Sequence, residues 1–285
     1  MAFGRLSSAG PPIAIEFGVG SLKALQVSSG ESPTLLAAAC LPTPEELLCD
    51  HAARLQYQAD SLPRLLKSAG IRGKRAMCSI PAPHTLVQHM NFQRAEGVSL
   101  TTLIGAQLQA SLSCDPSQIV IRHVEVKAPG QSGGPNSREV ICIAVARDVV
   151  LKLIGALKSC KLEVVGMHSE HLALIHAFDR ISAMMEAEKK DLATLYLDIG
   201  VCTTKVAIAH GRTPVFAKTI DVAGLTFDQI VARQLDTSIM DARAHRLALT
   251  AMVPDASAQR VKQGVGAAAP GGTSIDDVSL SPEDS

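Results

Sequence analysis

The sequence predicts an α/β fold made of two related lobes, with a small α+β subdomain inserted into the first. Predicted strands and helices alternate along residues 13–252. A strand-turn-strand hairpin at residues 13–27 recurs in similar form at residues 196–211. Between these hairpins, residues 84–165 carry their own strands and helices around a loop rich in Gly, Pro and Ser. The repeated hairpin therefore predicts two structurally equivalent half-domains.

The first lobe begins with three short runs of alternating apolar residues at 13–40. The turn signals GVGS and SSGESP separate these runs, which together predict an antiparallel meander. A helix is expected over residues 44–70, since Glu45 and Glu46 lie in its first turn and Gly70 is placed to end it. The run MCSIPAP then predicts a strand that stops at proline.

The later elements follow from the same periodic patterns. Strands are expected at 85–92, 118–127, 139–146, 162–167, 193–198, 205–209 and 215–221, and helices at 99–113, 148–160, 170–190, 225–235 and 240–252. Residues 1–10 are expected to form a flexible N-terminus. Residues 253–285 lack periodicity and large apolar side chains, so we expect a disordered tail there.

The composition favours a globular protein and argues against several classes of partner. Of the 285 residues, 47% are apolar, and Lys plus Arg equals Asp plus Glu at 27 each. The charge balance therefore gives no reason to expect nucleic acid as a partner. Trp is absent and 3% of residues are aromatic, which argues against a stacking surface for single strands. The seven scattered cysteines include no C-x-x-C pair, which indicates reduced thiols in a cytoplasmic protein.

The two hairpins share a pattern of acid, apolar residue, Gly, Val, small residue, hydroxyl, any residue and Lys. Glu16 and Asp198 stand at the ends of the first strands, and Gly18 and Gly200 lie in the turns. Glycine lets the backbone approach a phosphate closely, and neighbouring N–H groups and hydroxyls donate to phosphate oxygens. A nearby carboxylate can hold Mg²⁺ through water. Two such hairpins suit a metal-nucleotide cleft, although a single one is more often an ordinary β-turn.

These residues resemble the phosphate hairpins of the superfamily of actin and heat-shock chaperone ATPases. The closer resemblance is to the PilM family of type IV pilus assembly proteins, which is related to the division protein FtsA. It covers residues 13–250 and includes IEFGVGSLKALQV, IPAPHTLVQHMNF, ICIAVARDVVLKLIGALKSCKLEVVGM, HSEHLALIHAF and LYLDIGVCTTKVAIAHGRTPVFAKTIDVAG. The resemblance implies an actin-like, ribonuclease H-like ATPase fold. Its first lobe would comprise residues 11–83 and 166–190, its insert residues 84–165, and an incomplete second lobe residues 191–252.

The resemblance also implies roles for individual residues. Phosphate would be contacted by Gly18, Gly20 and Ser21 from one lobe and by Gly200, Thr203 and Thr204 from the other. Asp198 and Glu16 would hold Mg²⁺ through water, and Glu170 is the candidate for orienting a metal-bound water. Alternatively, Glu170 is a helix N-terminal acid favoured by the helix dipole. Lys23 and Lys205 are expected to be solvent-facing strand residues.

Two departures from the family pattern argue against catalysis. Glu16 stands where these ATPases carry aspartate, and the extra methylene disturbs metal geometry. The family also continues beyond the helix near Gln229 with a helical subdomain and a Gly-rich loop that holds adenosine, so the chain resembles a C-terminally truncated member. ATP and Mg²⁺ are the implied cofactors, and we expect hydrolysis to be weak or absent.

The implied function is that of a cytoplasmic scaffold in type IV pilus or type II secretion assembly. In the family, a groove between the insert and the first lobe takes a short cytoplasmic segment of an inner-membrane partner similar to PilN, which holds the protein at that membrane. The matching region here is residues 84–92 and the helix from Leu100. Two alternatives stay open: a Mg²⁺-dependent ATPase or phosphotransferase, and a self-associating filament or membrane tether like FtsA.

Other candidate sites are weaker. His168, His171 and His176 lie close together in the sequence, but no Cys or carboxylate cluster completes a tetrahedral metal site. Cys202 lies in the second hairpin turn without an identifiable base, so a small residue filling a turn is the better interpretation. We interpret the basic run at residues 72–75 as a turn exposed to solvent.

Overall fold

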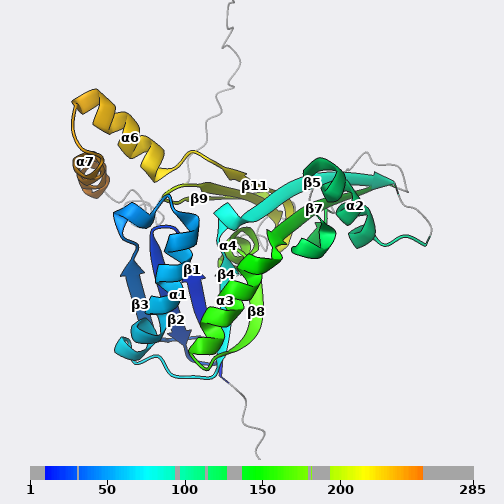
Figure 1. The fold of residues 1–285 in the computed structure, drawn as a ribbon, viewed down its shortest axis with the longest axis horizontal. Coiled ribbons are helices and arrows are strands. Elements are labelled where there is room, and N and C mark those ends of the chain that lie inside the picture. The colour runs from blue at the N-terminus through cyan, green and yellow to red at the C-terminus, as the bar shows by residue number, and fades with distance from the viewer. Residues whose placement is uncertain are drawn as a thin grey trace, which may run out of the picture. The chain divides into compact units, whose positions relative to one another are not determined.

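The computed structural model describes residues 10–30, 32–93, 97–112, 115–126, 137–178, 181 and 193–252. Their contacts divide the chain into two compact units, one up to Ile230 and one from Val231 onward. The three β-sheets of the described residues all belong to the first unit (Figure 1). The expected tail lies outside the described residues, as does the expected N-terminus apart from Gly10.

The elements follow the predicted order along the chain. The strands are β1 Ile13–Phe17, β2 Ser21–Val27, β3 Leu35–Pro42, β4 Arg75–Ile80, β5 Thr85–Gln93, β6 Ile119–Glu125, β7 Ser137–Ala146, β8 Glu163–Ser169, β9 Ala193–Ile199, β10 Thr204–His210 and β11 Thr213–Ile220. The helices are α1 His51–Ser68, α2 Leu100–Leu112, α3 Arg147–Ser159, α4 Glu170–Ala177, α6 Gly224–Leu235 and α7 Ile239–Met252. Short 3-10 turns cover Glu45–Leu47, Ala82–His84 and Pro116–Gln118.

Two helices have bounds that differ from those expected from the sequence. The helix expected over 44–70 begins later, at His51, because the side chain of Asp50 accepts hydrogen bonds from the backbone N–H groups two and three residues ahead. Its predicted end is confirmed, since Gly70 follows the helix with a φ of +66° that suits glycine. Of the helix expected over 170–190, α4 forms the first part, and most of the remainder lies outside the described residues.

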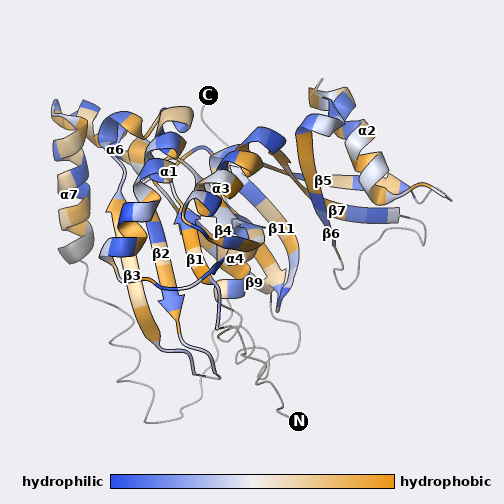
Figure 2. Cartoon of the chain, turned by 60° about the horizontal axis from the view of Figure 1, so that its bottom comes forward, coloured by the Kyte–Doolittle hydropathy of each residue, from blue (hydrophilic) through white to orange (hydrophobic). Residues whose placement is uncertain are grey.

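The largest sheet has the strand order β3-β2-β1-β4-β8 and confirms the predicted meander. β1 pairs antiparallel with β2 and parallel with β4. Alternate residues Ile13, Ile15 and Phe17 point into a core shared with α1 and α3, where Leu62 and Leu153 are fully buried. Figure 2 shows hydrophobic residues along β1 and β3 and mixed colouring on the helices, as expected for one buried helix face.

The inserted subdomain contains a sheet of order β5-β7-β6. One face packs against α2 through a core that includes Ile104 and Leu108. The opposite face packs against β11, and His89 Nε2 on β5 accepts a hydrogen bond of 3.3 Å from the backbone N–H of Ala217. The His89 ring also stacks on Phe216. The β5 side of the insert is therefore attached to the second half of the repeat.

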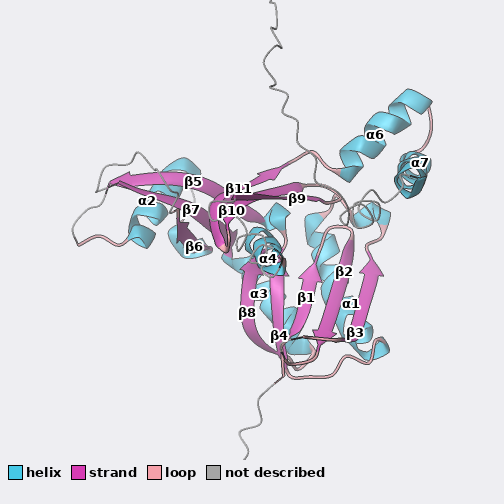
Figure 3. Cartoon of the chain, turned by 180° about the vertical axis from the view of Figure 1, so that it is seen from behind, coloured by secondary structure: helices cyan, strands magenta, loops and turns pink. Residues whose placement is uncertain are grey.

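Helix α4 links the first sheet to a third sheet of order β11-β10-β9. It contacts β4 and β8 of the first sheet and all three strands of the third (Figure 3). Ile175 on α4 packs against Tyr196, Ala207 and Ala209, so this helix covers one face of the third sheet. The second hairpin thus packs against the same helix that contacts β4, the strand beside β1 of the first hairpin.

Candidate functional site

The two hairpins fold with the same register. Glu16 on β1 lies directly opposite Lys23 on β2, and Asp198 on β9 lies directly opposite Lys205 on β10. In each hairpin the lysine Nζ pairs with the acid, at 2.9 Å from Glu16 Oε1 and 2.8 Å from Asp198 Oδ2. The repeat is thus confirmed as two equivalent antiparallel hairpins, and in both of them the acid pairs with a lysine.

The turns of the two hairpins touch each other. A Cβ on Gly20 would lie 2.7 Å from Cγ2 of Val201, so a larger residue there would have to displace this side chain. A Cβ on Gly18 would lie 2.8 Å from the carboxylate of Glu16, and one on Gly200 would lie 2.8 Å from a backbone oxygen of its own turn. At all three glycines, a Cβ would therefore lie under 3.0 Å from another protein atom.

The hydroxyl groups of the second turn are largely buried. Thr203 and Thr204 are 8% and 7% exposed, and Thr204 Oγ1 donates a hydrogen bond of 2.6 Å to the backbone oxygen of Val222. Ser21, the corresponding hydroxyl of the first hairpin, begins β2 and is half-buried. The structure thus brings the predicted phosphate-facing residues together. The hydroxyl proton of Thr204 is used in its hydrogen bond to the backbone.

Glu170 lies between the two hairpins at the start of α4. Ser169 caps this helix, because its hydroxyl accepts a hydrogen bond from the backbone N–H of Leu172. Glu170 Oε2 accepts hydrogen bonds of 3.1 Å from the backbone N–H of Ala82 and 3.1 Å from Lys205 Nζ. Burial raises the pKa of Glu170, although Lys205 and the Ala82 N–H act to lower it. Glu170 is therefore both a helix N-terminal acid and part of the hairpin site.

Lys205 does not face solvent, and that expectation from the sequence was wrong. Its side chain is 11% exposed, and its ammonium group contacts both Asp198 and Glu170. The lysine points inward because α4 covers the face of β10 that also carries Ala207 and Ala209. Burial acts to lower the pKa of Lys205, but the two carboxylates outweigh burial and raise the pKa above its ordinary value.

These residues do not fit a bound Mg²⁺. One carboxylate oxygen of Asp198 and one of Glu170 both contact Lys205 Nζ, and the Glu16 carboxylate pairs with Lys23. Within the described residues, no cluster of three His, Cys, Asp or Glu side chains could hold a metal ion. Mg²⁺ prefers near-octahedral oxygen donors, whereas here a cationic ammonium group contacts these carboxylate oxygens.

Two buried polar residues of α1, which the sequence prediction missed, donate hydrogen bonds to backbone oxygens, one of them in the first hairpin turn. Gln58 Nε2 donates 2.7 Å to the backbone oxygen of Gly18. Arg54 is 2% exposed and donates from Nη1 to the backbone oxygen of Leu48, which Cys202 of the second turn also approaches. Arg54, Gln58 and the core residue Leu62 are spaced four residues apart, and this helical spacing was the signal that placed both polar residues on the buried face.

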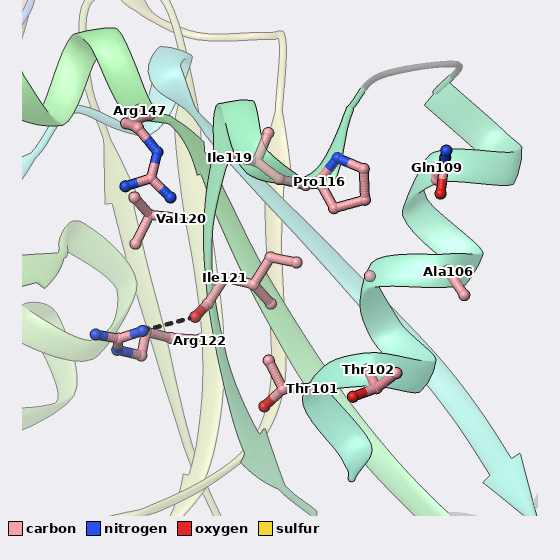
Figure 4. A pocket seen from close by; sticks show the side chains of 11 residues that line it. Thr101, Thr102, Ala106, Gln109, Pro116, Ile119, Val120, Ile121, Arg122 and Arg147 are labelled. Carbon is pink, nitrogen blue, oxygen red and sulfur yellow. Dashed lines mark hydrogen bonds between the residues drawn. The ribbon is translucent and has the colours of Figure 1, made fainter. Parts of the chain in front are cut away.

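A groove in the insert forms a second candidate site. It has a volume of about 620 Å³ and lies between α2 and β6, with Arg147 of α3 at its side. β6 is an edge strand that pairs only with β7 among the described residues, so its other edge is open to a further strand, although the backbone oxygen of Ile121 accepts a hydrogen bond of 2.9 Å from Arg122 Nη1. In Figure 4, Ile119 and Ile121 point toward α2, whereas Val120 and Arg122 point to the opposite side. The groove therefore follows the free edge of β6.

The position of this groove refines the region expected for a partner. The α2 part of the expectation coincides with the groove, since Thr101, Thr102 and Gly105 line it. The strand at 84–92 is β5, the other edge strand of the sheet, and β11 packs against the face of the sheet that carries Val87 of β5. The groove thus lies along β6, which the expectation from the sequence did not include.

Comparison with protein families matches residues 14–259 to the family described as type IV pilus assembly protein PilM. Comparison with the curated proteins finds no match. No described helix is both long enough and apolar enough to cross a membrane.

Among solved structures, the chain is similar to a PilM-PilN type IV pilus biogenesis complex, at 21% identity and a TM-score of 0.66, covering 82% of this chain and 68% of that one. Two weaker matches are the cytoplasmic domain of EpsL, an inner-membrane component of the Vibrio cholerae type II secretion system, and a Bacteroides thetaiotaomicron protein with an actin-like ATPase fold. The EpsL domain is 13% identical with a TM-score of 0.48, covering 77% of this chain and 74% of that one. The Bacteroides thetaiotaomicron protein is 10% identical with a TM-score of 0.43, covering 84% of this chain and 82% of that one.

The fold predicted from the sequence is confirmed as actin-like, and the insert interrupts the first lobe, because α3 packs in the core of the first sheet and β8 pairs with β4 after it. The family match spans more than half of the chain and includes both hairpins and the insert. This chain belongs to the PilM family of type IV pilus assembly proteins.

Proposed function

We propose that this chain is a cytoplasmic scaffold of type IV pilus assembly, or of related type II secretion, that holds a short segment of an inner-membrane protein. The observation that carries the proposal is the groove between α2 and the free edge of β6. The similar PilM-PilN structure is itself a complex, which supports a PilN-like partner. Through this partner the scaffold would lie at the inner membrane.

The groove favours an extended segment as its occupant. A strand added to the β6 edge would satisfy the free backbone groups there, and main-chain hydrogen bonds of this kind provide affinity. The apolar side chains of Ile119 and Ile121 would bind alternate residues of the segment on one side. On the other side, Arg122 and Arg147 are exposed cations that each donate one hydrogen bond to a backbone oxygen of this segment, and their remaining N–H groups suit an acidic side chain of the partner.

We also propose that the nucleotide site between the hairpins is degenerate. The contact between Gly20 and Val201 and the pairing of both hairpin acids with lysine support this proposal. The enzymatic alternative needs the acids to hold Mg²⁺, which the arrangement of Lys205 opposes. Self-association of the chain is a separate proposal that sedimentation analysis of the purified protein would test.

Matched substitutions on α2 test the partner proposal. Ala106 lines the groove and Ala110, one turn later on the same helix, does not, although both are exposed. With a labelled peptide from the cytoplasmic N-terminus of the PilN-like protein, we expect Ala106→Arg to weaken binding at least about tenfold, because the long side chain fills the groove. Ala110→Arg should change affinity by less than about twofold. Fluorescence anisotropy measures both.

Two results would contradict the proposal. One is absence of peptide binding to the unmodified chain at high micromolar concentration. The other is equal weakening by both arginine substitutions, which would show that the groove is not the site. Circular dichroism of each variant checks that the fold is retained.

A further inference from the structure

We infer that Lys205 is a resident cation in the place where the resemblance implies Mg²⁺, and that removing its ammonium group turns the same carboxylates into a divalent-metal site. The inference rests on the proposed degeneracy of the nucleotide site and is independent of the partner groove. It assigns Lys205 a role in joining the two halves of the fold without metal or nucleotide.

The geometry around the ammonium group carries the inference. Lys205 Nζ lies 2.8 Å from Asp198 Oδ2 and 3.1 Å from Glu170 Oε2, and the same Glu170 oxygen accepts the Ala82 N–H at 3.1 Å. A lysine ammonium is a compact charge with three donors, so it can bridge two carboxylates as a small cation does. The groups come from β9, β10, α4 and the turn after β4. The contact therefore joins the third sheet to the first.

The first hairpin supplies an internal comparison. Lys23 pairs with Glu16 at the equivalent register, but the two side chains are 51% and 41% exposed. Among the described residues, no second acid lies within ion-pair distance of Lys23. Lys205 differs by being 11% exposed and by meeting a second carboxylate, Glu170, that is equally buried. Burial and the second acid, not the repeat itself, make Lys205 the counterpart of a bound cation.

Removal of this lysine leaves donors that suit a divalent ion. Asp198 and Glu170 would each present at least one carboxylate oxygen toward the vacated position, and Asp198 is 44% exposed, so water can complete the coordination. Mn²⁺ accepts the same oxygen donors as Mg²⁺ and reports its own binding by electron paramagnetic resonance, because the signal of the free aqueous ion is lost on binding.

The experiment is a titration of the full chain with Mn²⁺ alone. Electron paramagnetic resonance measures the binding, and thermal unfolding measures the change in Tm. For the unmodified chain and for Lys23→Ala, we expect no specific Mn²⁺ binding at submillimolar concentration and a change in Tm of less than about 1 °C. Lys205→Ala should bind Mn²⁺ and gain about 5 °C in Tm near saturation. Lys205→Ala/Asp198→Asn should lose this site.

Several outcomes would overturn the inference. Specific Mn²⁺ binding by the unmodified chain that is lost in Asp198→Asn would show that the acids bind metal despite the lysine. Folded Lys205→Ala that binds no Mn²⁺ would show that no latent site exists. If Lys205→Ala is unfolded without metal, folding on addition of Mn²⁺ supports the inference, and failure of Mn²⁺ to restore folding contradicts it. Lys205→Arg, which retains a cation, should behave like the unmodified chain.

A parallel titration with MgATP separates this inference from the proposed degeneracy. A rise in Tm of more than about 3 °C with MgATP, abolished by Asp198→Ala, would contradict the degenerate nucleotide site. Absence of Mn²⁺ binding to folded Lys205→Ala would contradict only the latent metal site. The two failures therefore give different results.

Discussion

Lys205→Met is expected to lower the free energy of unfolding by about 3–5 kcal/mol, the range measured when one partner of a buried ion pair is removed. The substitution leaves the Glu170 carboxylate, which is 11% exposed, without its cation. Adding Glu170→Gln removes the uncompensated charge while keeping an acceptor for the Ala82 N–H. The double variant should therefore recover more than half of the loss, which chemical denaturation of all variants would measure.

The equivalent lysine of the other hairpin is the control. Lys23→Met removes an ion pair of the same register and length, but one that is exposed to solvent. Exposed pairs contribute about 0–1 kcal/mol, so we expect a change within that range. Equal losses for Lys23→Met and Lys205→Met would show that the contacts of Lys205 with two acids have no special importance for stability.

Phe17→Ala is expected to lower the free energy of unfolding by about 3–5 kcal/mol, because it deletes a ring in a close-packed core. Phe17 is the last residue of β1 and is 0% exposed among α1 and α3 side chains. The cavity would also lie next to the first hairpin turn. Denaturant unfolding should show a lower midpoint with an unchanged slope if the fold is retained.

The repeat again provides the control. Ile199 follows Asp198 as Phe17 follows Glu16, yet it is 54% exposed. Ile199→Ala should therefore change stability by less than about 1 kcal/mol. A loss as large as that of Phe17→Ala would contradict the assignment of the buried core to the first sheet.

The two hairpins show how far the sequence predicts the site. The alternating residues predict the strands, and the shared pattern predicts their equivalent registers. The pattern cannot predict which face is covered. In the first sheet, α1 and α3 cover the face of Ile13 and Phe17, whereas in the third sheet α4 covers the face of Asp198 and Lys205. Because these contacts are distant in sequence, the same Lys position is exposed in one hairpin and buried in the other.

The sequence does not predict the groove along β6, for a similar reason. The pattern predicts the strands that became β5, β6 and β7 and the helix that became α2, and the resemblance indicates the insert as the partner region. The strand order β5-β7-β6 is not sequential, so the sequence does not reveal that β6 has a free edge. The packing of β11 against the face of this sheet also depends on residues far along the chain.

Amide hydrogen exchange of the full chain, with and without the partner peptide, tests the scaffold proposal most directly. The account predicts that the peptide slows exchange in β6 and α2, since a strand added at the β6 edge engages its free amides. It also predicts that MgATP alone leaves the exchange of the hairpin turns at residues 17–21 and 199–204 unchanged. Unchanged exchange in β6 with peptide, together with protection of both turns by MgATP, would contradict the account and favour an ATPase.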